Sequence, residues 1–168
     1  MNGLSLAADR LDDPDLVEAS DPAGMLRQVA SAAAQLRIAL GAARDSGLGA
    51  MRPDDRPRAI VVAGAGAAAD LLSAICGGTA AVQVIGVSGY QLPGWVGAAD
   101  LVIAAGTGEP VQAIATEARR RGCHQAGIGS PGSALADLVR GPFVAIDPRA
   151  AATFASPSYL PIGGFVRT

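Results

Sequence analysis

The chain has 168 residues with a net charge of −2; half of them are hydrophobic, 17% are charged and only 4% are aromatic. This composition supplies a sizeable aliphatic core of the kind found in buried parallel sheets, and it has no basic excess for general binding to nucleic acid. We find no run of eighteen apolar residues and no signal-peptide pattern at the start, so we expect a cytoplasmic protein without a membrane span.

The first part of the chain predicts one long helix between two irregular segments. Residues 1–21 are acidic and contain the turn signal Asp12-Asp13-Pro14-Asp15. A helix is predicted from Asp21, a good N-cap, to about residue 44, with Pro22 at its first position. Residues 45–58 are rich in Gly, Pro and charge and are interpreted as a linker. The apolar residues of the helix recur at three- and four-residue steps: Met25, Val29, Ala32, Leu36 and Leu40.

From residue 59 onward, short apolar runs alternate with helical patterns. Strands are predicted at 59–63, 82–87, 101–105, 125–129 and 143–146, and helices at 67–76, 110–121 and 133–139. This alternation is typical of right-handed βαβ units with helices on both faces of the sheet. We therefore expect an α/β domain, a three-layer αβα sandwich with a five-stranded parallel sheet, preceded by the N-terminal helix.

Three segments follow from this pattern. Residues 1–58 form the N-terminal acidic segment, helix and linker, and residues 59–150 form the α/β domain. Residues 151–168 contain several Pro and Gly residues and are predicted to be an irregular tail.

Ligands of an open parallel sheet bind at the carboxyl ends of its strands, where two Gly-rich loops are expected. The first loop contains Gly64 and Gly66 and fits the dinucleotide pattern G-x-G-x-x-G/A. The acidic residue needed to hold the ribose is missing, because the end of the second strand reads Val87-Ser88-Gly89. Three interpretations of these glycines stay open: a dinucleotide site, a phosphosugar site, or close packing of helix on strand.

The second loop contains Gly106 and Thr107 and precedes a predicted helix. Its backbone N–H groups could hold an anion at the helix N-terminus. Glu109 lies in the first turn, where the helix dipole favours an acidic side chain. Its negative charge argues against an anion-binding site in this loop. Neither loop has a P-loop lysine, which argues against hydrolysis of a nucleoside triphosphate.

The remaining chemically notable residues favour structural roles. Cys76 and Cys123 lie among small or apolar residues and are interpreted as buried thiols in a reducing compartment. His124 is the only histidine, and neither a metal site nor a catalytic triad can be assembled around it. The basic run at residues 119–121 falls late in a predicted helix, where cations interact favourably with the dipole.

The segment between the second and third strands is the most distinctive. Residues 90–96 read Tyr-Gln-Leu-Pro-Gly-Trp-Val, and residues 100–104 read Asp-Leu-Val-Ile-Ala. This resembles the Tyr-x-Leu-Pro-x-Trp/Tyr-Val…Leu-Val-Ile-Ala stretch of bifunctional phosphoglucose/phosphomannose isomerases, which are built from sugar-isomerase (SIS) domains. The helix opened by Asp21 and the segment Pro148-Arg149-Ala150-Ala151 are also similar, so the resemblance covers roughly residues 15–152.

The resemblance implies a SIS-type fold, a homodimer, and a proton-transfer isomerisation of fructose 6-phosphate with glucose or mannose 6-phosphate. It implies no metal and no organic cofactor. No catalytic residue is carried over, because the acid/base Glu and His of the family lie in its second SIS domain, and His124 does not align with that histidine. The residues expected to contact a sugar phosphate are Gly64, Gly66, Gly106, Thr107 and Arg149.

Most of the family's phosphate-binding hydroxyls are missing. Ala67-Ala68 stand where the family has a serine in its first loop, and residues 103–105 replace the hydroxyls of its second loop. Each lost charged hydrogen bond costs about 1.5–3 kcal/mol. We therefore expect a phosphosugar-binding domain with weak or no isomerase activity in this chain alone. The alternatives are half of an active isomerase and a non-catalytic dimerisation or regulatory module.

Overall fold

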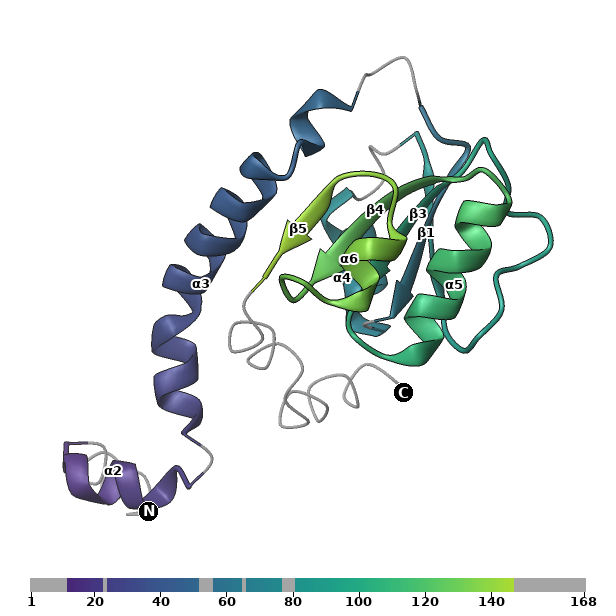
Figure 1. Cartoon of the computed structure of the whole chain (residues 1–168). Helices are drawn as coiled ribbons and strands as arrows, with labels where there is room; N and C mark the ends of the chain where they lie inside the picture. Colours follow the sequence, from purple (N-terminus) through teal and green to yellow (C-terminus); the bar gives the residue numbers. More distant parts are fainter. Residues whose placement is uncertain (1–11, 23, 52–55, 65, 77–80, 147–168) are drawn as a thin grey trace. The chain divides into compact units, whose positions relative to one another are not determined.

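The computed structural model describes residues 12–22, 24–51, 56–64, 66–76 and 81–146 (Figure 1). The chain divides into two compact units, residues 1–37 and 38–168. The elements in chain order are α2 (Pro14–Ser20), α3 (Met25–Asp45), the 3-10 helix η1 (Leu48–Ala50), β1 (Ala59–Gly64), α4 (Gly66–Cys76), β2 (Gln83–Val87), β3 (Leu101–Ala105), α5 (Glu109–Arg120), β4 (His124–Gly129), α6 (Ala134–Leu138) and β5 (Phe143–Ala145).

The acidic turn signal near the N-terminus starts a helix, so the prediction that residues 1–21 are irregular is wrong for α2. The carboxylate of Asp13 accepts the N–H groups of Asp15 and Leu16 at 3.1 and 3.3 Å. Pro14 occupies the first turn, where its missing N–H costs nothing. A cap and a proline that were interpreted as a turn therefore begin a short helix.

Asp21 caps the long helix as predicted, but α3 begins later than the sequence suggested. The carboxylate of Asp21 accepts the N–H groups of Met25 and Leu26, both at 2.8 Å. Gly24 has a φ of +64°, a conformation outside the right-handed helix that glycine adopts at little cost. The helix therefore starts at Met25, and not at Pro22.

The prediction of a five-stranded parallel sheet is confirmed. The strand order is β2-β1-β3-β4-β5, and every neighbouring pair is parallel. All five strands lie within one residue of their predicted bounds. Val62 in β1 pairs with Gly86 in β2 and Ile103 in β3, which fixes the register at the centre of the sheet.

Helices cover both faces of the sheet (Figure 1). On one face, Val61 and Val102 pack with Ile114 of α5, and a second buried cluster joins α5 to Leu135 of α6. On the other face lies α4, so close to β2 that a Cβ at Gly86 would lie 2.9 Å from the Cβ of Ala69. These are the three layers that the alternation of strands and helices predicts.

The connection from β2 to β3 contains no helix. Residues 88–100 instead run irregularly along the α5 face of the sheet, and Leu92 and Val96 are buried in the same cluster as Val61, Val102 and Ile114. The segment at residues 90–96 therefore contributes to the hydrophobic core through Leu92 and Val96. An irregular segment in such a place needs donors for its backbone carbonyls, because unpaired polar groups are costly to bury.

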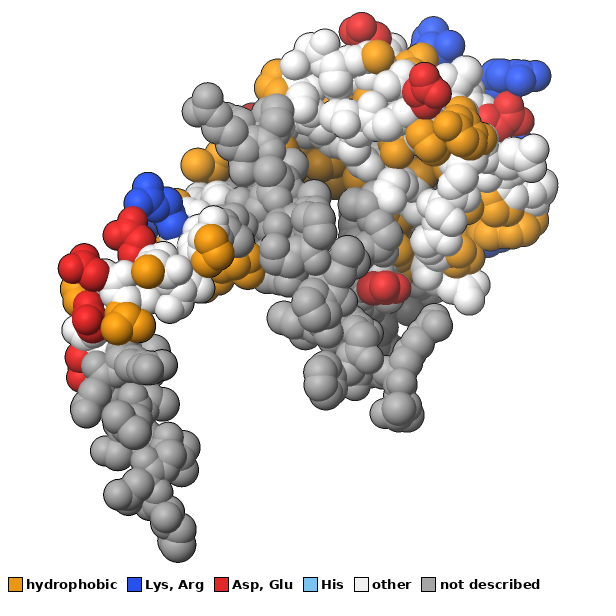
Figure 2. Space-filling model, turned by 90° about the horizontal axis from the view of Figure 1, so that it is seen from below, with side chains coloured by type: hydrophobic (Ala, Val, Ile, Leu, Met, Phe, Trp, Pro, Cys, Tyr) orange, Lys and Arg blue, Asp and Glu red, His pale blue; other side chains and the backbone are white. Residues whose placement is uncertain are grey.

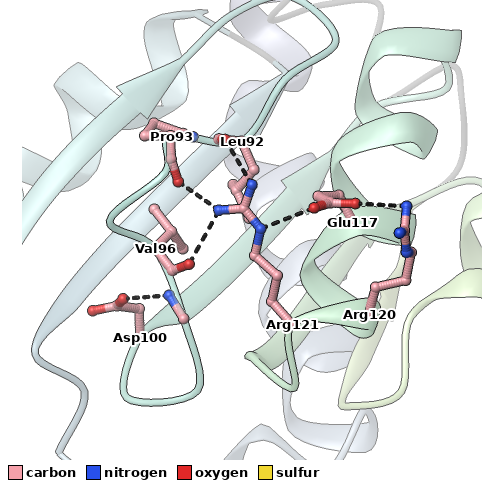
Figure 3. Close-up of polar contacts among 8 residues, drawn as sticks. Leu92, Pro93, Val96, Asp100, Glu117, Arg120 and Arg121 are labelled. Carbon is pink, nitrogen blue, oxygen red and sulfur yellow. Dashed lines mark hydrogen bonds and ion pairs between the residues drawn. The ribbon is translucent and has the colours of Figure 1, made fainter.

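Arg121 supplies these donors (Figure 3). Its guanidinium donates to the carbonyl oxygens of Leu92, Pro93 and Val96 at 3.2, 2.6 and 3.2 Å. The same group forms an ion pair with Glu117 one turn earlier in α5, at 2.9 Å. Arg121 therefore has a structural role through its contacts with the connection from β2 to β3, whereas the predicted interaction of the run at 119–121 with the helix dipole stays a prediction.

A second arginine fixes the other end of this connection. Arg58, just before β1, donates to both carboxylate oxygens of Asp100 at 3.0 and 2.7 Å and to the carbonyl of Trp95 at 2.7 Å. The side chain of Asp100 is completely buried, whereas that of Arg58 is 58% exposed. Hydrogen bonding from Arg58 is the main reason that the pKa of Asp100 lies below its ordinary value, although burial opposes this effect.

No helix in the described ranges is both long enough and apolar enough to cross a membrane. The predicted irregular tail, residues 151–168, lies outside the described residues, and the domain boundaries at 58 and 150 stay predictions.

Replacing Arg121 by Ala should lower the free energy of unfolding by about 2–3 kcal/mol, because three carbonyls of the buried connection lose their charged donor. Urea unfolding followed by circular dichroism measures this change. Arg120→Ala is the matched control, because Arg120 makes only an exposed pair with Glu117 and its loss should cost about 0.5 kcal/mol or less. Equal losses in the two variants would contradict the role given to Arg121.

The lowered pKa of Asp100 predicts a loss of stability in acid. Since this carboxyl holds its proton less tightly in the folded state than in the unfolded state, its contribution is complete above the ordinary Asp pKa of about 3.9 and disappears as the pH falls through the folded value. The melting temperature should therefore fall as the pH is lowered below about 5, and less steeply in Asp100→Asn, which should already melt several degrees lower at pH 7. Asp137→Asn, at an exposed position in α6, should leave the pH profile unchanged.

Candidate functional site

The strand order reverses direction between β1 and β3, and in open α/β sheets this is the point where ligands bind. A pocket of about 360 Å³ lies there, at the carboxyl ends of β1, β2 and β3. Its lining residues are Gly64, Val87, Ser88, Gly89, Ala105, Gly106, Thr107, Gly108, Pro110, Val111 and Ile114. The pocket therefore combines three strand ends with the first turns of α5.

Two glycines at the strand ends have backbone conformations that other residues rarely adopt. Gly64 at the end of β1 has a φ of +113°, and Gly106 just after β3 has a φ of +124°. A Cβ at Gly64 would also overlap the carbonyl oxygen of Ala105 and approach Val111 Cγ2 to 2.9 Å. Only a glycine at position 64 therefore lets the end of β1 lie this close to the end of β3 and to Val111 in the first turn of α5. These elements form one wall of the pocket.

The N-terminus of α5 offers few free N–H groups to an anion. Gly108 is the N-cap and has no side chain to cap the helix, while Pro110 has no N–H. The N–H groups of Val111 and Gln112 already donate to the carbonyl of Gly108. Glu109 is thus the one residue of the first turn whose N–H donates to no other residue within the described segments, and its own carboxylate is exposed nearby.

Two hydroxyl groups provide the polar side chains of the pocket. Ser88 follows β2 and Thr107 follows β3, and neither hydroxyl bonds to another residue in the described part of the chain. The floor is apolar, formed mainly by Val87, Val111 and Ile114. This arrangement suits a small polar ligand. Its hydrogen-bond acceptors would face the two hydroxyls, and its carbon atoms would pack on the apolar floor.

Three of the five predicted contact residues meet in this pocket: Gly64, Gly106 and Thr107. Gly66 begins α4, and its surroundings lie outside what the structure describes. Arg149 lies outside the described residues. Their roles as ligand contacts stay predictions.

Ser88 is a pocket residue that was not predicted from the sequence, where the end of β2 is notable only as the position for a ribose-binding acid. Because β2 lies beside β1 in the sheet, its carboxyl end reaches the same edge as Gly64. The polar Val87-Ser88-Gly89 turn directly after an apolar strand was the available signal.

The pocket is uncharged. None of its described lining residues is an acid, a base or a thiol. The end of β2, where a dinucleotide site needs an acidic residue, brings Val87 and Ser88 into the lining instead. Over the face seen in Figure 2, basic and acidic side chains of the described residues are interspersed, and no continuous basic surface forms there.

The reactive side chains of the described chain lie elsewhere. His124 begins β4 and Cys123 precedes it, at the amino edge of the sheet. Cys123 is buried as predicted, and burial raises the pKa of its thiol, whereas the side chain of Cys76 lies outside the described part. No cluster of three or more His, Cys, Asp or Glu side chains suited to a metal ion occurs among the described residues.

No protein-family model matches the sequence, and no curated protein matches it. One solved structure with some likeness is the NanR protein of Vibrio vulnificus complexed with ManNAc-6P. It aligns with a TM-score of 0.43 and 15% sequence identity, over 90% of this chain and 60% of that chain. A likeness of this size does not assign the chain to a family.

Proposed function

We propose that this chain is a SIS-type domain that binds a sugar phosphate weakly at the carboxyl ends of β1, β2 and β3, with little or no isomerase activity of its own. The observation that carries the proposal is the pocket at the point where the strand order reverses, lined by Gly64, Gly106 and the hydroxyls of Ser88 and Thr107. The resemblance of residues 90–104 to phosphosugar isomerases supports the ligand class.

The polarity of the pocket sets the affinity. A phosphate group leaving water needs several donors, and the two side-chain hydroxyls among the described lining residues are fewer than a tight site offers. Each missing charged hydrogen bond costs about 1.5–3 kcal/mol, or at least tenfold in affinity. We therefore expect dissociation constants in the millimolar range, improved if Arg149 reaches the ligand as the resemblance implies.

The same polarity argues for binding without catalysis. An aldose–ketose isomerisation moves a proton between neighbouring carbon atoms, and a positioned acid or base is needed to carry it. The described lining residues contain no such group. If the chain is half of an active isomerase, a second domain or chain supplies that group.

Fructose 6-phosphate at 10 mM should raise the melting temperature by a few degrees, because a ligand at about ten times its dissociation constant stabilises the folded state by about 1.4 kcal/mol. Thr107→Ala and Arg149→Ala should each reduce or abolish this shift. Thr116→Ala is the matched control, since its hydroxyl donates to the carbonyl of Gln112 within α5 and not to the pocket.

Two outcomes would contradict this function. An equal shift with unphosphorylated fructose would show that the phosphate is not recognised, and no shift at 10 mM would exclude the pocket as a phosphosugar site. A coupled isomerase assay on the same preparation should detect no turnover; turnover by this chain alone would overturn the non-catalytic interpretation.

A second candidate function, self-association through α3, is favoured by the surface of that helix. Leu26, Val29, Leu36 and Leu40 are between 52% and 61% exposed. With Ala33 between Val29 and Leu36, they repeat at alternating three- and four-residue steps, which is the spacing of a helix that packs against a second helix.

Leu36→Glu should shift the chain from dimer to monomer, because a charge at this seam would be desolvated in the paired state. Light scattering after size exclusion measures the molar mass. Ala34→Glu introduces the same charge at an exposed position to the side of the seam and should leave the dimer intact. A monomeric parent chain at high micromolar concentration would contradict the dimer outright.

A further inference from the structure

A second pocket, of about 250 Å³, lies at the amino edge of the sheet, where β3 and β4 begin and the chain enters β5. It belongs to the 38–168 unit, and none of its described lining residues is shared with the pocket at the carboxyl ends. Its lining residues are Met51, Pro57, Leu101, Cys123, His124, Gln125, Arg140, Gly141 and Pro142.

The two basic residues of this pocket come from neighbouring segments at this edge of the sheet. His124 pairs with Leu101 across β3 and β4. The N–H of Gly127 donates to the carbonyl of Pro142 at 2.9 Å, which continues the ladder between β4 and the residues entering β5. Arg140 precedes Pro142 by two residues and therefore lies beside the start of β4, level with His124.

Gln125 fixes this arrangement from inside the domain. Its side chain is only 6% exposed. Its amide Nε2 donates to the carbonyl of Ala115 in α5 at 2.6 Å, and its Oε1 accepts the backbone N–H of Arg140 at 3.2 Å. The backbone of Arg140 is thus tied to the core while its side chain is left for the surface.

The basic side chains have no partner inside the described chain. The guanidinium of Arg140 and the imidazole of His124 form no hydrogen bond or ion pair with another described residue, and none of the described lining residues is acidic. Arg58 and Arg121 differ, because each is paired with a carboxylate and with backbone carbonyls. Two unpaired nitrogen donors at one pocket present a complementary surface to an oxyanion.

We propose that this amino-edge pocket binds a small organic anion. The anionic oxygens lie against Arg140 and His124, and the carbon part of the ligand packs on the apolar side chains of the pocket. These apolar side chains are Met51, Pro57, Leu101 and Pro142. The site is independent of the proposed phosphosugar pocket, so either site can exist without the other.

The single histidine of the chain is a direct reporter for this site. The imidazole resonances of His124 should shift saturably when the full chain is titrated with sodium butyrate at constant pH and ionic strength. Acetate should bind roughly tenfold more weakly than butyrate, because it lacks two methylene groups that the apolar side chains would bury. Inorganic phosphate, which carries the charge without the carbon part, should also bind more weakly than butyrate.

Arg140→Gln should weaken butyrate binding by about tenfold or more, since it removes the charged fork while the backbone N–H to Gln125 remains. Arg119→Gln, an exposed arginine near the end of α5, is the matched control and should leave the affinity unchanged. The melting temperatures of both variants without ligand should equal that of the parent chain, which shows that the fold is intact.

Three results would overturn the proposal: resonances of His124 that do not saturate, an equal response to sodium chloride, or an unchanged affinity in Arg140→Gln. If phosphate binds as tightly as butyrate, the apolar side chains do not contribute and the organic part of the proposal is wrong. None of these results affects the thermal shift with fructose 6-phosphate, which is tested through Thr107.

Discussion

The guanidinium of Arg121 is the contact on which the domain most depends. The chain crosses from β2 to β3 without a helix, so a segment with no internal hydrogen-bond ladder covers part of the hydrophobic core. Three of its carbonyls accept hydrogen bonds from Arg121, and this lets Leu92 and Val96 stay buried against Ile114. A lysine could not replace this arginine, because only the planar fork reaches three carbonyls and Glu117 at the same time.

The position of the proposed phosphosugar pocket follows from this constraint. Ser88 and Gly89 lie where β2 ends and the irregular connection begins, so the anchoring of residues 92–96 also limits where that wall of the pocket can move. The far end of the connection is held by Arg58 and the buried carboxylate of Asp100. The pocket wall therefore rests on two buried or half-buried arginine contacts, although its own side chains are small and exposed.

The fold could be predicted from the sequence because strand length, helix length and apolar runs are local signals. All five strands follow from short aliphatic runs such as residues 101–105, and the prediction of a parallel sheet needed only the alternation with helices. The start of α3 was misplaced because the φ of Gly24 cannot be read from its neighbours. The role of Arg121 could not be predicted, because its partners lie 25 to 29 residues away.

In the candidate site too, some residues could be predicted from local signals and others could not. Gly64 and Gly106 were found because a glycine directly after a strand is a local signal, whereas Ser88 joins them only through the order of strands in the sheet. That order also separates the two kinds of chemistry in the domain. The carboxyl ends carry hydroxyls and an apolar floor, and the amino edge carries the histidine, a thiol and an unpaired arginine. Because His124 and Thr107 lie at opposite edges of one sheet, His124 cannot act on a ligand held beside Thr107.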